Sequence, residues 1–420
     1  MPFFTKPFVT KSLSRRATFW SASAVLALCL WASAVASVLY PTYEAHWRLS
    51  AVVITSVFGT YPVALLLVLV VFGGVSDYIG RRRTMLAGIA LIAVSAILFA
   101  VAPSVGWLFA ARALQGIGTG FAIGAASARL VENNISRNPR FASSLTTAST
   151  ATGLTLALVL SGLLAQLAPL PLVLSFVVLF VLAVASFAFV ALTPDDRPAP
   201  SGVRWRPQPL HLAAGTVRPF ILATLSVSVA FSVGALFLSL GSSMARQLTH
   251  TTNLAVIGAT LAVSPLVIGV TALIIQRMHA HLAIVLGGVI SIAGLALMAA
   301  TASVGSLLLL LLWAGVAGVG YSLAFTGGLS LLARTTPDRH RGATLSLLYL
   351  FSYLMQAVSA IGAGALATAF GLGPSIGIVA PVVGVLCVAA IILAAVDFTG
   401  QRQLPVPAVA AVSAGAVRTH

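Results

Sequence analysis

The chain has 420 residues, of which 59% are hydrophobic and only 7% are charged, and its formal net charge is +16. This composition excludes a soluble globular protein and is typical of a protein that crosses a membrane many times. The positive charge does not indicate a nucleic-acid-binding protein, because the basic residues fall between apolar segments. The two cysteines, Cys29 and Cys387, lie within apolar segments, so we expect no disulfide framework.

The hydrophobic segments predict an all-α membrane protein. The first apolar run resembles a signal peptide, but it is long enough to span a bilayer and many similar runs follow it. Twelve transmembrane spans are expected at about 18–40, 50–72, 84–103, 105–131, 141–166, 169–192, 219–243, 252–276, 282–302, 304–333, 342–370 and 374–396.

Residues 193–218 interrupt this pattern with prolines, aspartates and arginines, and we expect them to form an extended solvated linker. The linker divides the chain into two six-helix bundles that we interpret as an internal repeat. The expected parts are an N-terminal segment at 1–17, bundles at 18–192 and 219–396 with the linker between them, and a tail at 397–420.

The basic residues predict the orientation of the chain. Apart from Arg48, Arg112 and Arg246, every lysine and arginine lies in a segment that this topology places on one side. The positive-inside rule makes that side cytoplasmic, with both termini. Lysine is nearly absent, with only Lys6 and Lys11, which is typical of a GC-rich bacterial coding sequence and indicates a bacterial inner membrane.

The loop at 73–83, which joins the second and third expected spans, reads GGVSDYIGRRR. Gly73 and Asp77 are four residues apart and share one helix face, and Gly80 permits a sharp turn. A positive-inside loop would account for the arginines alone, but the full pattern G-x-x-x-D-x-x-G-R-R is more specific. It resembles the signature between helices 2 and 3 of the major facilitator superfamily of transporters.

This resemblance implies a carrier whose two halves rock about a central site, and it implies gating roles near the loop. The candidate gating residues are Gly73, Asp77, Gly80, Arg81, Arg82 and Glu132. We expect Asp77 to act as a latch toward the start of span 342–370, where free N–H groups attract anions. Glu132 is expected to pair with Arg81; the alternative is a solvated carboxylate beside Arg129.

Arg112 is the only charged residue deep within an expected span. A central arginine costs at least ~2.5 kcal/mol by insertion scales, so other groups must offset it. One alternative is that it snorkels to the interface marked by Trp107. The pattern L-x-x-x-R-x-x-Q-G-x-G from Leu108 resembles the superfamily's second signature, in helix 4. That resemblance implies that Arg112 faces the central cavity, with Gln115 beside it, and serves coupling or substrate binding.

Two spans are richer in polar side chains than the others. Span 141–166 carries many serines and threonines, and span 342–370 carries Tyr349, Tyr353 and Gln356, which we take as candidate substrate residues. Polar groups in spans usually face the bundle interior. The alternative for the hydroxyls is a hydrogen bond back to their own helix.

Two features weaken a prediction of proton-driven export. The region 153–162 has no proline, whereas exporters of the resembling family often carry a Gly-Pro-rich signature there. No acid and no histidine lies in the middle of a span, and a proton-coupled carrier normally needs such a group. Glu44 and His46 are the nearest candidates, although the aromatic run around them is more typical of an interfacial belt.

The sequence therefore predicts a secondary active transporter that moves a small organic solute by alternating access, first of all an exporter of drug-like molecules or metabolites. One alternative is an importer of sugars or organic anions with Arg112 as the anion partner. Another is a receptor or scaffold on the same fold. We expect no enzyme and no cofactor, because no nucleophile–base pair or metal-ligand cluster is evident. The expected partners are a small-molecule substrate, protons as a candidate coupling ion and the bilayer, with a monomeric protein and no nucleic acid.

Overall fold

A computed structural model describes residues 14–137, 140–195, 216–336 and 341–402, and within these ranges the regular structure is entirely helical. The twelve long helices are α1 (Arg15–Ala34), α3 (Ala51–Phe72), α5 (Arg81–Ala100), α6 (Val105–Glu132), α7 (Arg140–Leu167), α8 (Leu174–Ala191), α9 (Val217–Gln247), α10 (Leu254–Ile274), α11 (Ala280–Val304), α12 (Leu307–Thr335), α13 (Arg341–Phe370) and α14 (Leu372–Arg402). The short elements are α2 (Tyr40–Trp47), α4 (Val75–Ile79) and the 3-10 helix η1 (Ile275–Arg277).

The twelve long helices agree with the expected number of spans. Eleven of them are long and apolar enough to cross a membrane. The other one, α6, has 28 residues but carries Arg112, Arg129 and Glu132, which lower its hydropathy. Its length of about 42 Å, at ~1.5 Å per residue, exceeds the hydrocarbon thickness of a bilayer.

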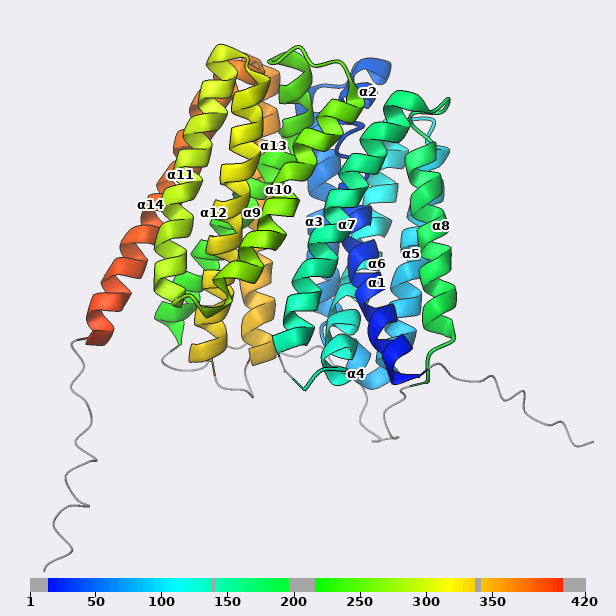
Figure 1. Cartoon of the computed structure of the whole chain (residues 1–420). Helices are drawn as coiled ribbons and strands as arrows, with labels where there is room; N and C mark the ends of the chain where they lie inside the picture. The colour runs from blue at the N-terminus through cyan, green and yellow to red at the C-terminus, as the bar shows by residue number, and fades with distance from the viewer. Residues whose placement is uncertain (1–13, 138–139, 196–215, 337–340, 403–420) are drawn as a thin grey trace, which may run out of the picture.

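The helices form two bundles that lie side by side and repeat one packing arrangement (Figure 1). In the first bundle α1 packs against α6, α7 and α8, and α5 packs against α6 and α8. In the second bundle α9 packs against α12, α13 and α14, and α11 packs against α12 and α14. The same set of neighbours in each half supports the internal repeat read from the sequence.

The two bundles meet mainly along the helix pairs α3–α13 and α7–α10. The second pair is held at both of its ends. The side chain of Gln166 accepts a hydrogen bond from the backbone N–H of Leu254 at 2.8 Å, and the side chain of Gln276 donates one to Ser144, also at 2.8 Å. The α7–α10 seam is therefore held near both ends of the molecule.

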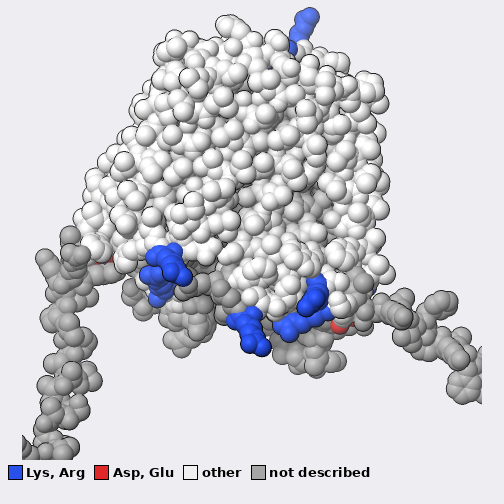
Figure 2. All heavy atoms as spheres, in the orientation of Figure 1, with Lys and Arg blue, Asp and Glu red and all other residues white. Residues whose placement is uncertain are grey.

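The two ends of the molecule differ in charge. Lysine and arginine side chains gather at the end where α4 lies, which we call the basic end (Figure 2). The short helix α2 lies at the other end, which we call the α2 end (Figure 1). This asymmetry is the one expected from the positive-inside rule.

Three expected boundaries need comment. The first span, expected at 18–40, is wrong at its end: α1 stops at Ala34, and α2 begins at Tyr40 with Pro41 in its first turn. The tail expected from residue 397 begins later, because α14 continues to Arg402 and its Asp397 carboxylate lies 2.7 Å from the His281 ring of α11. Most of the expected linker, 196–215, lies outside the described residues.

Candidate functional site

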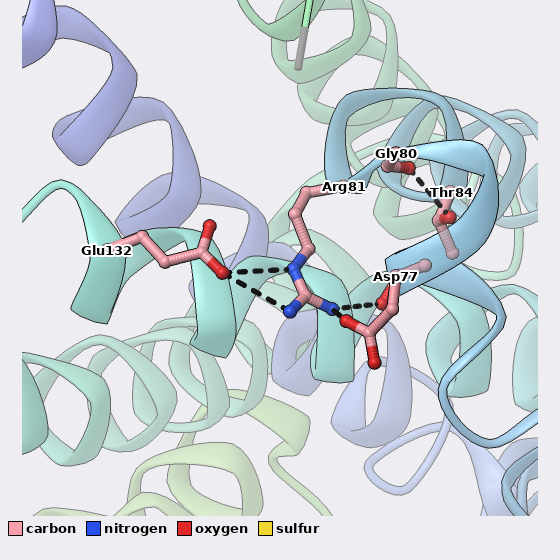
Figure 3. Close-up of polar contacts among 6 residues, drawn as sticks. Asp77, Gly80, Arg81, Thr84 and Glu132 are labelled. Carbon is pink, nitrogen blue, oxygen red and sulfur yellow. Dashed lines mark hydrogen bonds and ion pairs between the residues drawn. The ribbon is translucent and has the colours of Figure 1, made fainter. Parts of the chain in front are cut away.

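A tight turn separates α4 from α5 at the basic end. Gly80 has φ 95°, a left-handed conformation that glycine adopts without strain. Its carbonyl accepts a hydrogen bond from the Thr84 hydroxyl at 3.0 Å (Figure 3). The turn brings Arg81, the first residue of α5, within reach of Asp77 in the short helix α4 (Figure 3).

The Arg81 guanidinium joins two helices (Figure 3). Its Nη1 lies 2.5 Å from the Asp77 carboxylate of α4, and its Nη2 and Nε donate to one Glu132 oxygen of α6 at 3.2 and 3.3 Å. The Arg81–Glu132 contact is therefore present as expected. Asp77 and Glu132 are 55% and 52% exposed, so each pair contributes about 0–1 kcal/mol of stability.

Two further arginines at this end, Arg82 and Arg129, bind carbonyls at and just after the end of α8. Arg82 donates to the carbonyls of Val190 and Ala191, the last residues of that helix, where a cation is favourable. Arg129, the other candidate partner of Glu132, is 2% exposed and donates to the Pro194 carbonyl at 2.9 Å. The surroundings of Arg129 are therefore not those of a solvated surface pair.

Asp77 was expected to contact the start of α13. Residues 337–340, which precede that helix, and the side chains of its first three residues lie outside the described part of the chain. Gly73 nevertheless shows that the loop lies against the first turns of α13. A Cβ atom on Gly73 would lie 3.9 Å from the Ser346 hydroxyl. A gating role for Gly73, Asp77, Gly80 and the neighbouring arginines stays a prediction.

The Arg112 guanidinium is fully buried, with 0% of the residue exposed. Its Nη1 donates to the Ser33 carbonyl of α1 at 3.0 Å and to the Gln115 side chain at 2.8 Å, and its Nη2 donates to the Tyr40 hydroxyl. Three aromatic rings also face it, with centroids 5.7, 5.8 and 5.9 Å away, and they belong to Tyr40, Tyr61 and Phe99.

Neutral acceptors and ring faces thus offset the buried charge of Arg112, and cation–π contacts contribute about 0.5–2 kcal/mol each. Gln115 lies beside it as expected. Arg112 was expected to face the central cavity with Gln115 beside it. In this structure neither side chain has exposed surface, so neither one lines an open cavity. Snorkelling is also excluded here, since the break after α1 brings Ser33 and Tyr40 to the guanidinium inside the bundle.

Helix α13 presents three faces. Ser352 and Ser359 hydrogen-bond serines of α9, whereas Ala357 and Ile361 lie against Gly59 of α3. The exposed face carries Phe351, Leu354 and Val358. The sector between the α9 face and the α3 face therefore points toward the space between the bundles.

Tyr349, Tyr353 and Gln356 occupy this inward sector, by the 100° rotation per helical residue. All three keep part of their surface exposed. Tyr353 lies near Tyr61 and Cys29 of the other bundle. The structure therefore brings the expected substrate residues of α13 to the centre of the molecule.

Aromatic rings of two neighbouring helices complete this region. The ring centroids of Tyr353 and Phe231, a residue of α9, are 4.8 Å apart. The Phe231 ring also stacks on Phe325 and Tyr321 of α12, at centroid distances of 5.9 and 6.3 Å. The resulting aromatic cluster consists of Phe231, Tyr321, Phe325, Tyr349 and Tyr353. The sequence does not single out Phe231, Tyr321 and Phe325, because aromatic residues in apolar spans are equally typical of lipid-facing positions.

The hydroxyls of α7 mostly bond to their own helix. Thr146, Thr147, Ser149 and Thr150 each donate to the carbonyl four residues earlier, at 2.7 to 3.3 Å. These bonds match the alternative given for the hydroxyl-rich span, in which the hydroxyls bond back to their own helix. In the part of the chain that the structure describes, no group of three or more metal-ligating side chains is present.

Comparisons with known proteins agree with this geometry. The family model described as Major Facilitator Superfamily matches residues 19–312. None of the curated proteins compared with the chain matches it.

Three solved structures share the fold. The nucleoside transporter NupG has a TM-score of 0.69 at 12% identity and covers 90% of this chain and 100% of its own. A bacterial homologue of the human lysosomal transporter Spinster, inward-facing and unoccupied, has a TM-score of 0.66 at 13% identity, with coverages of 93% and 96%. The peptide transporter POT in complex with sulfate has a TM-score of 0.73 at 16% identity, with coverages of 94% and 96%. At these identities the likeness shows the fold alone.

Proposed function

Because the chain belongs to the major facilitator superfamily, we propose that it is a secondary active transporter that moves a small organic solute across a bacterial inner membrane by alternating access. The observation that carries this proposal is the pair of repeated bundles that meet along α3–α13 and α7–α10. Rocking about these seams would expose a central site to one side at a time. By the positive-inside rule the basic end is cytoplasmic, as are both termini.

The aromatic cluster supports an aromatic, drug-like or metabolite substrate, and we propose efflux as the direction of transport. The rings of Tyr349 and Tyr353 lie in the inward sector of α13, and the rings of α9 and α12 pack beside them. Arg112, the only charged residue deep within an expected span, has no exposed surface. Apolar and aromatic linings suit solutes of the same character. A sugar needs a denser set of polar groups, and an organic anion needs an accessible cation, so the importer alternative is less well supported.

Counterflow in proteoliposomes tests the proposal. Purified protein is reconstituted, the liposomes are loaded with an excess of unlabelled solute, and uptake of labelled tetraphenylphosphonium, uridine and a dipeptide is followed in parallel. We expect counterflow of the aromatic probe, and a drop of at least tenfold in Tyr353→Leu because the ring that links α13 to Phe231 is lost. Val358→Leu, on the exposed face of α13, is the matched control and should transport normally.

Counterflow of no probe above that of empty liposomes would favour the scaffold alternative. In everted vesicles, uptake driven by an imposed proton gradient would support efflux. Uptake only in right-side-out vesicles would favour the importer.

The Arg81–Glu132 contact is proposed to gate the basic end. We expect Arg81→Ala and Glu132→Ala each to slow transport a few-fold, and the double variant to be no slower than the single ones, because both remove the same contact. Arg16→Ala, which removes an exposed arginine at the same end, is the control and should have no effect. Strictly additive effects on the transport rate would show that this pair does not act as a unit.

A further inference from the structure

The short helix α2 belongs to the first bundle in sequence but contacts α9 of the second. Both carboxylate oxygens of Glu44 accept from the Ser243 hydroxyl of α9, at 3.1 and 3.2 Å. This contact joins the bundles at the α2 end, away from the α3–α13 and α7–α10 seams. It also shows that the run from Tyr40 to Trp47 is not an interfacial belt, since Tyr40 and Tyr43 are 0% and 2% exposed.

A second hydrogen bond runs parallel to the first. Arg246 lies one helical turn after Ser243, and its Nη1 donates to the Pro41 carbonyl at 3.0 Å. Pro41 in turn lies one helical turn before Glu44. Two side chains of α9, Ser243 and Arg246, therefore hold consecutive turns of α2 through the Glu44 carboxylate and the Pro41 carbonyl, and we call this pair of contacts the clasp. Opening this end must break both contacts.

The clasp places a carboxylate in a half-buried position. Burial raises the pKa of Glu44, and the Ser243 hydrogen bond and the Arg246 charge lower the pKa only in part. The other titratable or charged groups on α2 and at its end are the buried Tyr40 and Tyr43 and the exposed His46 and Arg48. The outer half of α3, from Ala51 to Tyr61, carries no charged residue.

We propose that Glu44 senses protons at the α2 end and that its protonation stabilises closure of that end by α2 and α9. This proposal rests on the alternating-access function above. When the end opens, Glu44 is freed from α9 and gains water, so its proton affinity falls to the ordinary value of a glutamate. The closed form then binds the proton more tightly, and by linkage acid on that side favours closure. Each unit of pKa difference changes the ratio of closed to open forms about tenfold across the titration.

Distances between spin labels across the α2 end test this. Labels on Leu170→Cys and Val304→Cys, exposed residues of opposite bundles, report closure in lipid nanodiscs, with the buried Cys29 and Cys387 replaced by alanine. We expect the short-distance population to grow as the pH falls from 8 to 5. Glu44→Gln keeps a hydrogen-bonding group beside Ser243 without the charge, so it should be mostly closed and insensitive to pH.

Two further variants separate the sensor from its surroundings. His46→Gln removes the nearby titratable ring and should leave the pH response unchanged. Ser243→Ala removes the Ser243–Glu44 hydrogen bond but keeps the Arg246–Pro41 bond, and it should shift the population toward the open form at every pH.

Each alternative outcome contradicts the proposal. The proposal fails if the wild-type populations do not respond to pH, if Glu44→Gln responds like wild type, or if His46→Gln abolishes the response. Two distance populations that ignore pH, with counterflow intact, would overturn the role of Glu44 and leave the transport function standing. One fixed distance together with no counterflow would overturn both.

Discussion

Gly364→Leu is expected to abolish transport. Gly364 of α13 packs against α3, and a Cβ atom at this position would lie 1.8 Å from the Thr55 hydroxyl and 2.9 Å from the Ala51 carbonyl. Thr55 is fully buried and bonds to Ala51 in its own helix at 3.0 Å, so it has no room to retreat. A leucine must therefore wedge α3 and α13 apart near the α2 end. Overpacking of this kind costs about 1–3 kcal/mol.

The same helix supplies the control. Gly362 lies two residues away, and a Cβ atom there would meet no atom within 4 Å. Gly362→Leu changes the helix propensity by the same amount as Gly364→Leu, so any difference between them reports the contact with α3. Counterflow and melting temperature should both separate the two variants. Wild-type transport by Gly364→Leu would show that the seam between the bundles is not tightly packed.

The long spans and their orientation follow from the sequence because the bilayer imposes them. An apolar run of about 20 residues is needed to cross the hydrocarbon, and lysine and arginine are retained on one side. The turn and the Asp77–Arg81 pair of the loop at 73–83 can also be predicted from the sequence, because Asp77, Gly80 and Arg81 lie close together in the chain. The Arg81–Glu132 contact could be predicted from charge balance, because Glu132 is the only acid between Asp77 and Asp195.

The surroundings of Arg112 could not be read from the sequence. They depend on a break after α1, and hydropathy does not reveal a break inside a continuous apolar run. The break brings a backbone carbonyl, that of Ser33, to the guanidinium, and a carbonyl has no sequence signature. The clasp between α2 and α9 could not be predicted for a related reason. Ser243 is one of many hydroxyls in apolar spans, and only the fold shows which of them lies beside Glu44.

Substitutions at Arg112 are expected to have the second large effect. Arg112→Ala leaves the Ser33 carbonyl and the Gln115 side chain without their donor in a site that is 0% exposed. Loss of one member of such a buried network costs about 3–5 kcal/mol. Arg112→Lys keeps the charge but cannot reproduce the planar fork, which reaches Ser33, Gln115 and Tyr40 together. Both variants should lower the melting temperature and slow counterflow at least tenfold.

Arg112→Met decides whether the charge itself serves transport. Methionine fills similar volume, and apolar replacement of a buried ionic group is often close to neutral for stability. The ring faces of Tyr61 and Phe99 would still pack against it. If Arg112 takes part in coupling, this variant should fold with a melting temperature near wild type and still fail in counterflow. A folded Met variant that transports normally would show that Arg112 only ties the break after α1 to α6, and the coupling role predicted from the helix 4 signature would be wrong.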